Sequence, residues 1–131
     1  MDYGITVRTA LPFAEAATRV REALKEQGFG VLTEIDVQAT LRERLGQEME
    51  EYLILGACNP PLAHRALAAD NSIGLLLPCN VVIRTDGAQT VVEALDPQVM
   101  VTVAGEPSLK AVADEASSRL RAALRSLPAA D

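Results

Sequence analysis

The stretch from Tyr52 to Pro61 constrains the fold of this 131-residue chain more than any other. Residues 52–57 are almost wholly apolar, and this run is too short for a typical helix, so it predicts a strand covered on at least one face. Asn59 is a favoured N-cap residue, and Pro60 suits the first helical position. The segment therefore predicts a strand, a turn at Cys58-Asn59 and a helix over residues 61–69.

The rest of the chain alternates short strand-like and helical segments. Strands are predicted at residues 5–9, 29–35, 75–85 and 89–95, the last two forming a hairpin around Asp86-Gly87. Apolar spacing predicts helices between Pro12 and Gly28 and from Pro107 onward, whereas residues 98–104 are less defined. Asp36 is predicted to cap a short helix through residue 45, whose apolar stripe is Val37, Leu41 and Leu45. This order predicts a single α+β domain, residues 1–131: a two-layer sandwich with a mostly antiparallel sheet of about five strands and helices packed on one face.

Composition excludes several classes of partner. A formal charge of −6 repels nucleic acid and anionic lipid surfaces. The four aromatic residues are too few for base stacking, and no apolar run approaches the length of a membrane span. The start of the chain lacks the pattern of a secretory signal, so we expect a cytoplasmic protein with free thiols.

Both cysteines and the single histidine fall between residues 58 and 79, and each cysteine is followed by an asparagine. Cys58 precedes a predicted helix N-terminus, whose N–H groups and dipole could favour a thiolate or a bound anion. Burial of Cys58 as a small hydrophobe, with Asn59 acting only as a cap, is the competing interpretation. Cys79 shares strand parity with Val81 and Ile83, which predicts burial.

Other roles for these side chains stay open. A Cys₂His metal site could be formed by Cys58, His64 and Cys79. The spacing of these residues matches no common metal-binding motif, and metal binding is not predicted as the main function. Cys58 could act as a nucleophile with His64 as its base, without a recognisable third residue. Glu34 could work as an acid or base, or lie on the surface or at an interface. The predicted ligand-contacting set is Cys58, Asn59, His64, Cys79, Asn80 and Glu34.

Three separated motifs carry a resemblance to a known family. They are Gly28-Phe29-Gly30-Val31-Leu32-Thr33-Glu34-Ile35-Asp36-Val37, Leu55-Gly56-Ala57-Cys58-Asn59-Pro60-Pro61-Leu62-Ala63 and Leu76-Leu77-Pro78-Cys79-Asn80-Val81. Together they resemble the bacterial family called domain of unknown function 302, across essentially the whole chain. The resemblance implies a two-layer α+β sandwich and a homodimer, and it implies no established reaction or cofactor.

Three functions follow as hypotheses. The first is a homodimeric module that binds a small molecule, anionic or thiol-reactive, at the Cys58-Asn59-Pro60 turn. The second is a cysteine-dependent enzyme or redox protein that uses Cys58. The third is a structural or interaction protein whose motifs serve packing and dimerisation alone.

Overall fold

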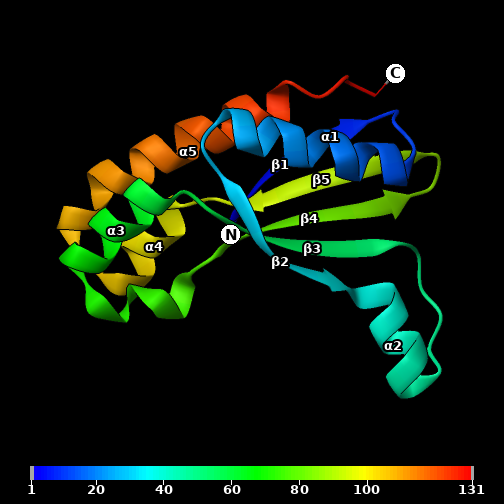
Figure 1. Ribbon diagram of the computed structural model, residues 1–131, viewed down its shortest axis with the longest axis horizontal. Coiled ribbons are helices and arrows are strands. Elements are labelled where there is room, and N and C mark those ends of the chain that lie inside the picture. Colours follow the sequence, from blue (N-terminus) through cyan, green and yellow to red (C-terminus); the bar gives the residue numbers. More distant parts are fainter. Residues whose placement is uncertain (1, 131) are drawn as a thin grey trace.

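The computed structural model describes residues 2–130 and contains one five-stranded sheet (Figure 1). The strands lie in the order β1 (Gly4–Thr9), β5 (Gln89–Leu95), β4 (Cys79–Asp86), β3 (Tyr52–Cys58) and β2 (Gly30–Asp36). Every neighbouring pair is antiparallel. The predicted α+β fold is confirmed, and the sheet is wholly rather than mostly antiparallel.

Two long helices cover one face of the sheet: α1 (Phe13–Glu26) and α5 (Lys110–Arg125). The sheet presents matched apolar rows to them, because cross-strand register aligns residues of equal parity. One such row consists of Ile5, Ala94, Val81 and Leu55. Each member is at most 6% exposed, and burying a Val, Leu or Ile side chain stabilises the fold by roughly 1.5–3 kcal/mol relative to leaving it exposed.

A second, smaller apolar cluster lies at one end of the sheet. It is built by α3 (Pro60–Ala69), α4 (Gln98–Ala104) and the 3₁₀ turns η1 (Asn71–Leu76) and η2 (Pro107–Leu109), packed around the start of α5 (Figure 1). Its buried members are Leu62, Ala66, Ile73, Met100, Leu109, Val112 and Ala116. The stretch 98–104, which was less defined by its sequence, is thus a helix that completes this cluster.

Two local predictions differ from the structure in their residue bounds. Residues 75–78 are not part of the fourth strand: η1 extends to Leu76, Leu75 is 87% exposed, and the strand begins only at Cys79. The hairpin pairs Asp86 with Gln89, so its two-residue loop is Gly87-Ala88 rather than Asp86-Gly87. Gly87 has a φ of 61°, which glycine adopts at the first loop position without strain.

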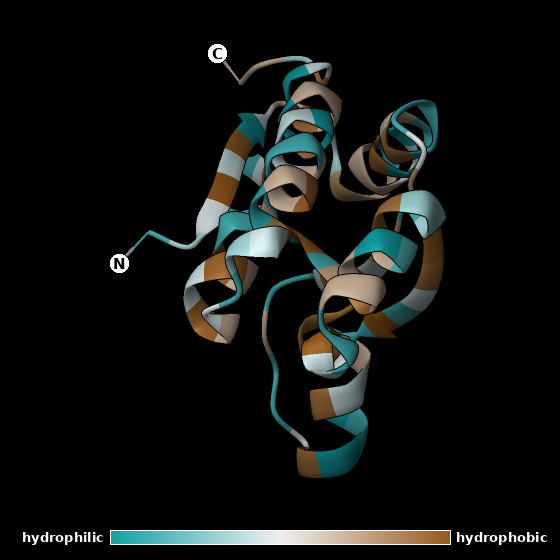
Figure 2. Cartoon of the chain, turned by 90° about the vertical axis from the view of Figure 1, so that its left-hand side faces the viewer, coloured by the Kyte–Doolittle hydropathy of each residue, from teal (hydrophilic) through white to brown (hydrophobic). Residues whose placement is uncertain are grey.

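Helix α2 (Val37–Leu45) projects from the body between β2 and β3 (Figure 1). Asp36 caps it, as predicted, by accepting a hydrogen bond from the backbone N–H of Ala39 at 2.9 Å. None of its residues is buried, so the predicted apolar stripe of Val37, Leu41 and Leu45 has no full cover. In Figure 2, α2 is the lowest helix, and brown hydrophobic bands lie among its teal ones.

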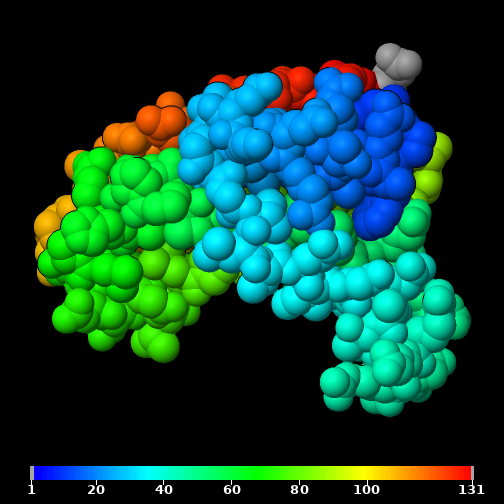
Figure 3. All heavy atoms as spheres, in the orientation of Figure 1, coloured from blue at the N-terminus to red at the C-terminus, as the bar shows by residue number. Residues whose placement is uncertain are grey.

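Among residues 2–130, no layer of helices covers the second face of the sheet. One row across it contains Thr6, Glu93, Val82, Ile54 and Ile35, and Ile35 is 49% exposed. Figure 3 shows a hollow on this side of the molecule, between the projecting α2 and the segment that contains η1.

Candidate functional site

The turn between β3 and α3 forms as its sequence predicts. Asn59 is the N-cap of α3, and its side-chain oxygen accepts a hydrogen bond from the backbone N–H of Leu62 at 3.3 Å. Pro60 and Pro61 occupy the first two helical positions and have no N–H to donate. The backbone N–H of Ala63 donates to the carbonyl of Asn59 at 2.8 Å. The backbone N–H groups of Leu62 and Ala63 in the first turn of α3 therefore both have acceptors.

The number of free backbone N–H groups determines how well this turn can bind an anion. A helix N-terminus holds an anion through unsatisfied backbone N–H groups together with the helix dipole. Here the two prolines remove two of these donors and the Asn59 side chain takes up the Leu62 N–H, which leaves the backbone N–H of Asn59 itself. Backbone donors therefore give an anion little support at this position, and the helix dipole is the main favourable influence on Cys58.

Asn59 also joins α3 to the end of α1. Its side-chain nitrogen donates to the carbonyl of Gln27 at 3.4 Å, and the guanidinium of Arg119 in α5 donates to the same carbonyl at 3.3 Å. Gly28 follows with a φ of 85°, and a Cβ there would lie 3.0 Å from the Asn59 side-chain nitrogen. Three helices are thus tied together at one carbonyl beside the turn.

A small pocket opens at this turn, with a volume of about 30 Å³, enough for one or two water-sized groups. It lies where the two apolar clusters meet, and both cysteines line it. Its lining residues are Phe29, Ala57, Cys58, Asn59, Leu62, Ala63, Ala66, Leu77, Pro78, Cys79, Met100, Val112 and Ala116. The surface that lines the pocket is almost entirely apolar, and Asn59 supplies its one side-chain amide.

Cys79 is buried, as its strand parity predicts, with 7% of its surface exposed. It pairs directly with Ala57, the residue before Cys58, on the neighbouring strand. Burial, and then the proximity of Cys58, raise the pKa of the Cys79 thiol to about 11. At neutral pH Cys79 is therefore a protonated thiol, while Cys58 is partly exposed.

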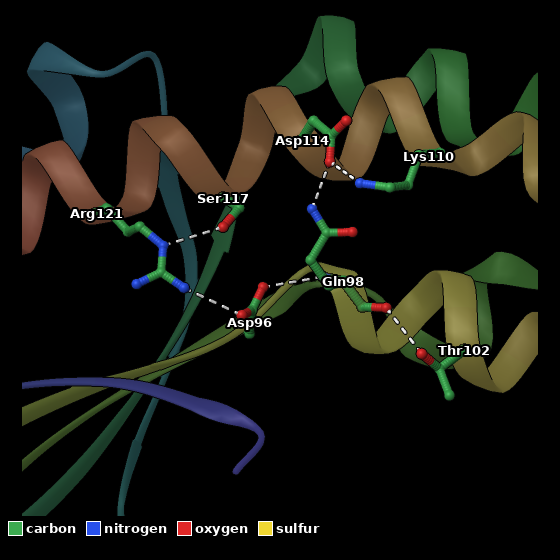
Figure 4. A network of polar contacts seen from close by, with 7 residues as sticks. All are labelled: Asp96, Gln98, Thr102, Lys110, Asp114, Ser117 and Arg121. Atoms are coloured by element: carbon green, nitrogen blue, oxygen red, sulfur yellow. Dashed lines mark hydrogen bonds and ion pairs between the residues drawn. The ribbon is translucent and has the colours of Figure 1, made fainter.

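Met100 reaches the pocket from α4, whose position depends on a polar network (Figure 4). Asp96, at the end of β5, accepts hydrogen bonds from the backbone N–H of Gln98 at 3.0 Å and from the Arg121 guanidinium at 3.2 Å. The Gln98 side chain donates in turn to Asp114 at 2.6 Å. These contacts fasten the start of α4 to α5. No motif around Met100 pointed to this position.

Glycine is required at position 56, beneath one wall of the pocket. A Cβ on Gly56 would lie 2.2 Å from the hydroxyl oxygen of Thr33 and 2.9 Å from the ring of Pro78. Real side chains do not approach so closely, so the absence of a side chain lets Thr33 and Pro78 close over the β3 backbone.

The other predicted site residues lie elsewhere. His64 is exposed on α3 and does not line the pocket. Glu34 is exposed on β2 and forms an ion pair with Arg21 of α1 at 2.5 Å. Asn80 faces the uncovered side of the sheet, where it borders a separate hollow of about 260 Å³ together with Tyr52 and Glu93. Within residues 2–130, no three His, Cys, Asp or Glu side chains are grouped to hold a metal ion.

Comparisons with known proteins agree with the fold. The family model described as "Domain of unknown function DUF302" matches residues 5–127. A solved structure, the "uncharacterized conserved protein DUF302 from Bacillus stearothermophilus", is similar with a TM-score of 0.89 and 32% identity. The match covers 95% of this chain and 98% of that one. No curated protein matches, and no helix among residues 2–130 is long and apolar enough to span a membrane. This chain belongs to the DUF302 family of domains of unknown function.

Proposed function

We propose that this domain is a homodimeric binding module that holds a small ligand in the pocket at the β3–α3 turn. The observation that carries the proposal is that both cysteines, Cys58 and Cys79, line one small, partly open apolar pocket. Binding sites are typically apolar cavities with a few convergent reactive or polar groups. Here the thiols of Cys58 and Cys79 are those groups.

The size of the pocket limits the ligand. About 30 Å³ admits a single ion or one small group of a larger molecule, while the remainder of that molecule would stay outside. With two prolines and a capped Leu62 N–H, the start of α3 offers few free N–H groups to an anion, so the ligand class that we propose is a thiol-reactive or thiophilic species.

Native mass spectrometry of the protein purified from its own host tests this function. We expect a bound mass on the wild-type chain that is lost in Ala63→Leu, because the larger side chain fills the pocket. Ala68→Leu is the matched control, since Ala68 is exposed on the same helix and lies outside the pocket. No bound mass on the wild type, or equal retention in Ala63→Leu, would reject the pocket as the binding site.

The homodimer is proposed from the projecting α2 and the neighbouring edge strand β2. Leu45 is 67% exposed on α2, and Leu32 and Ile35 are 67% and 49% exposed on β2. Adjacent exposed charges of opposite sign on α2, Glu43 and Arg44, suit pairing with a second copy across a two-fold axis. An uncovered apolar edge of this kind is a typical interaction surface.

Light scattering after size exclusion tests the dimer. We expect twice the 14.0 kDa chain mass for the wild type and the single-chain mass for Leu45→Glu. Leu75→Glu is the control, because Leu75 is 87% exposed but lies on η1, away from α2. A wild-type mass of one chain, or a dimer that survives Leu45→Glu, contradicts this interface.

A second candidate function is redox chemistry, favoured by the two thiols on adjacent strands. A small-molecule disulfide could oxidise Cys58 and Cys79 to one disulfide, releasing two small-molecule thiols, so that bonds and electrons balance. Mass spectrometry after incubation with oxidised glutathione would show the loss of two hydrogens per chain. If only a mixed disulfide on Cys58 forms, the thiols do not act as a redox pair.

A further inference from the structure

Sulfur atoms are concentrated at the pocket. The chain has two cysteines and three methionines, and Cys58, Cys79 and Met100 all line the same space. They come from three different elements: the end of β3, the start of β4 and the middle of α4. This convergence was not visible in the sequence, because no local motif links the three residues.

The chemistry around these sulfurs is selective. Apart from Asn59 and the three sulfur-containing residues, the lining side chains are hydrocarbon, and both functional atoms of the Asn59 amide are engaged by Leu62 and Gln27. A hard cation such as Mg²⁺ requires several oxygen ligands, which this pocket lacks. Thiolate and thioether sulfur are instead the ligands that select Cu(I).

We propose that this pocket binds one Cu(I) ion through the sulfur atoms of Cys58, Cys79 and Met100; the proposal rests on the pocket being the binding site. Binding forms two Cu–thiolate bonds and one Cu–thioether bond. The two S–H bonds break, both protons pass to solvent, and copper keeps its oxidation state. The bound unit then carries one net negative charge, which the positive end of the α3 dipole beside Cys58 stabilises.

A coordinating metal displaces the protons of the two thiols. Zinc suits the site less well, because it takes four tetrahedral ligands and the histidine, His64, is exposed outside the pocket.

Anaerobic competition against a chromophoric Cu(I) chelator tests the proposal, with cuprous ion as the probe. We expect one Cu(I) per wild-type chain and no competitive binding by Cys58→Ala. Met100→Leu keeps the side-chain volume but removes the thioether, so we expect a loss of affinity on the order of tenfold. Met49→Leu is the matched control, because Met49 lies in the segment before β3 and does not line the pocket.

The possible outcomes separate this proposal from the broader one. Absence of competition by the wild type overturns the copper site, and so does equal affinity of wild type and Met100→Leu. If a different small ligand is retained by wild type and lost in Ala63→Leu, the binding function stands without copper. If wild type and Ala63→Leu bind Cu(I) equally well, the ion lies outside the pocket and the copper proposal fails. Circular dichroism of each variant confirms that it is folded before these comparisons are made.

Discussion

The side-chain nitrogen of Asn59 donates to the backbone carbonyl of Gln27, so the residue that caps α3 also holds the end of α1. Because Asn59 is 8% exposed, loss of its side chain would leave the Leu62 N–H without its acceptor and the Gln27 carbonyl with only the Arg119 guanidinium as donor. The amide therefore links local helix initiation to the packing of the pocket wall.

Asn59→Ala is expected to lower the free energy of unfolding by about 1–2 kcal/mol, the usual cost of losing an N-cap. Asn59→Asp separates the two contacts, since a carboxylate can still accept from Leu62 but cannot donate to Gln27. Urea unfolding of both variants measures this. If Asn59→Asp is as stable as wild type, the bond to Gln27 contributes nothing to stability.

Gly56→Ala is expected to destabilise the domain by about 1–3 kcal/mol, because the new methyl group collides with Thr33 and Pro78. Adding Thr33→Ala should recover part of the loss by removing the nearer obstacle. Gly74→Ala is the control: an added Cβ meets nothing within 4 Å, and the backbone φ is not positive. If thermal unfolding gives Gly56→Ala and Gly74→Ala the same unfolding temperature, the close packing above β3 is contradicted.

Stability should fall between about pH 9 and pH 11 because of Cys79. The native state raises the pKa of this thiol from 9.0 to about 11, so in this window the native state keeps a proton that the unfolded state releases. The contribution is complete below pH 9 and is lost as pH rises, amounting to up to about 3 kcal/mol. Cys58 is the other titratable side chain that lines the pocket.

Denaturant unfolding of wild type and Cys79→Ala at pH 8 and pH 10.5 isolates this effect, because other groups titrate equally in both proteins. The stability difference between the two should shrink at the higher pH. A difference that does not change with pH would mean that Cys79 titrates normally.

Alkylation should distinguish the two cysteines in the native protein. Cys58 is partly exposed and should react with iodoacetamide, whereas Cys79 is buried and mostly protonated at neutral pH. Peptide mass spectrometry should locate the first adduct on Cys58, and Cys79 should react only after denaturant is added. If Cys79 in the native Cys58→Ala variant reacts as fast as Cys58 does in the wild type, the pocket is more open than described.

Sequence alone determined those features that depend on neighbours along the chain. The Asn59 cap, the prolines after it and Asp36 before α2 were all predicted correctly, because capping involves residues only a few positions apart. Strand parity likewise predicted the burial of Cys79. The apolar periodicity of α5 and the alternation of short strands sufficed for the α+β class.

Only the tertiary structure decided which distant residues meet. Met100 joins the cysteines because β3 pairs with β4 and because Gln98 and Asp96 fasten α4 to α5. His64 and Glu34 were separated from the pocket by the direction their elements take, which composition does not encode. The apolar stripe of α2 was predicted from its spacing, but only the structure shows that Val37 and Leu41 are half-buried and Leu45 is exposed, since periodicity reports that a face is apolar but not what covers it. Long-range register and packing, rather than local propensity, therefore bring the three sulfur-containing residues to one pocket.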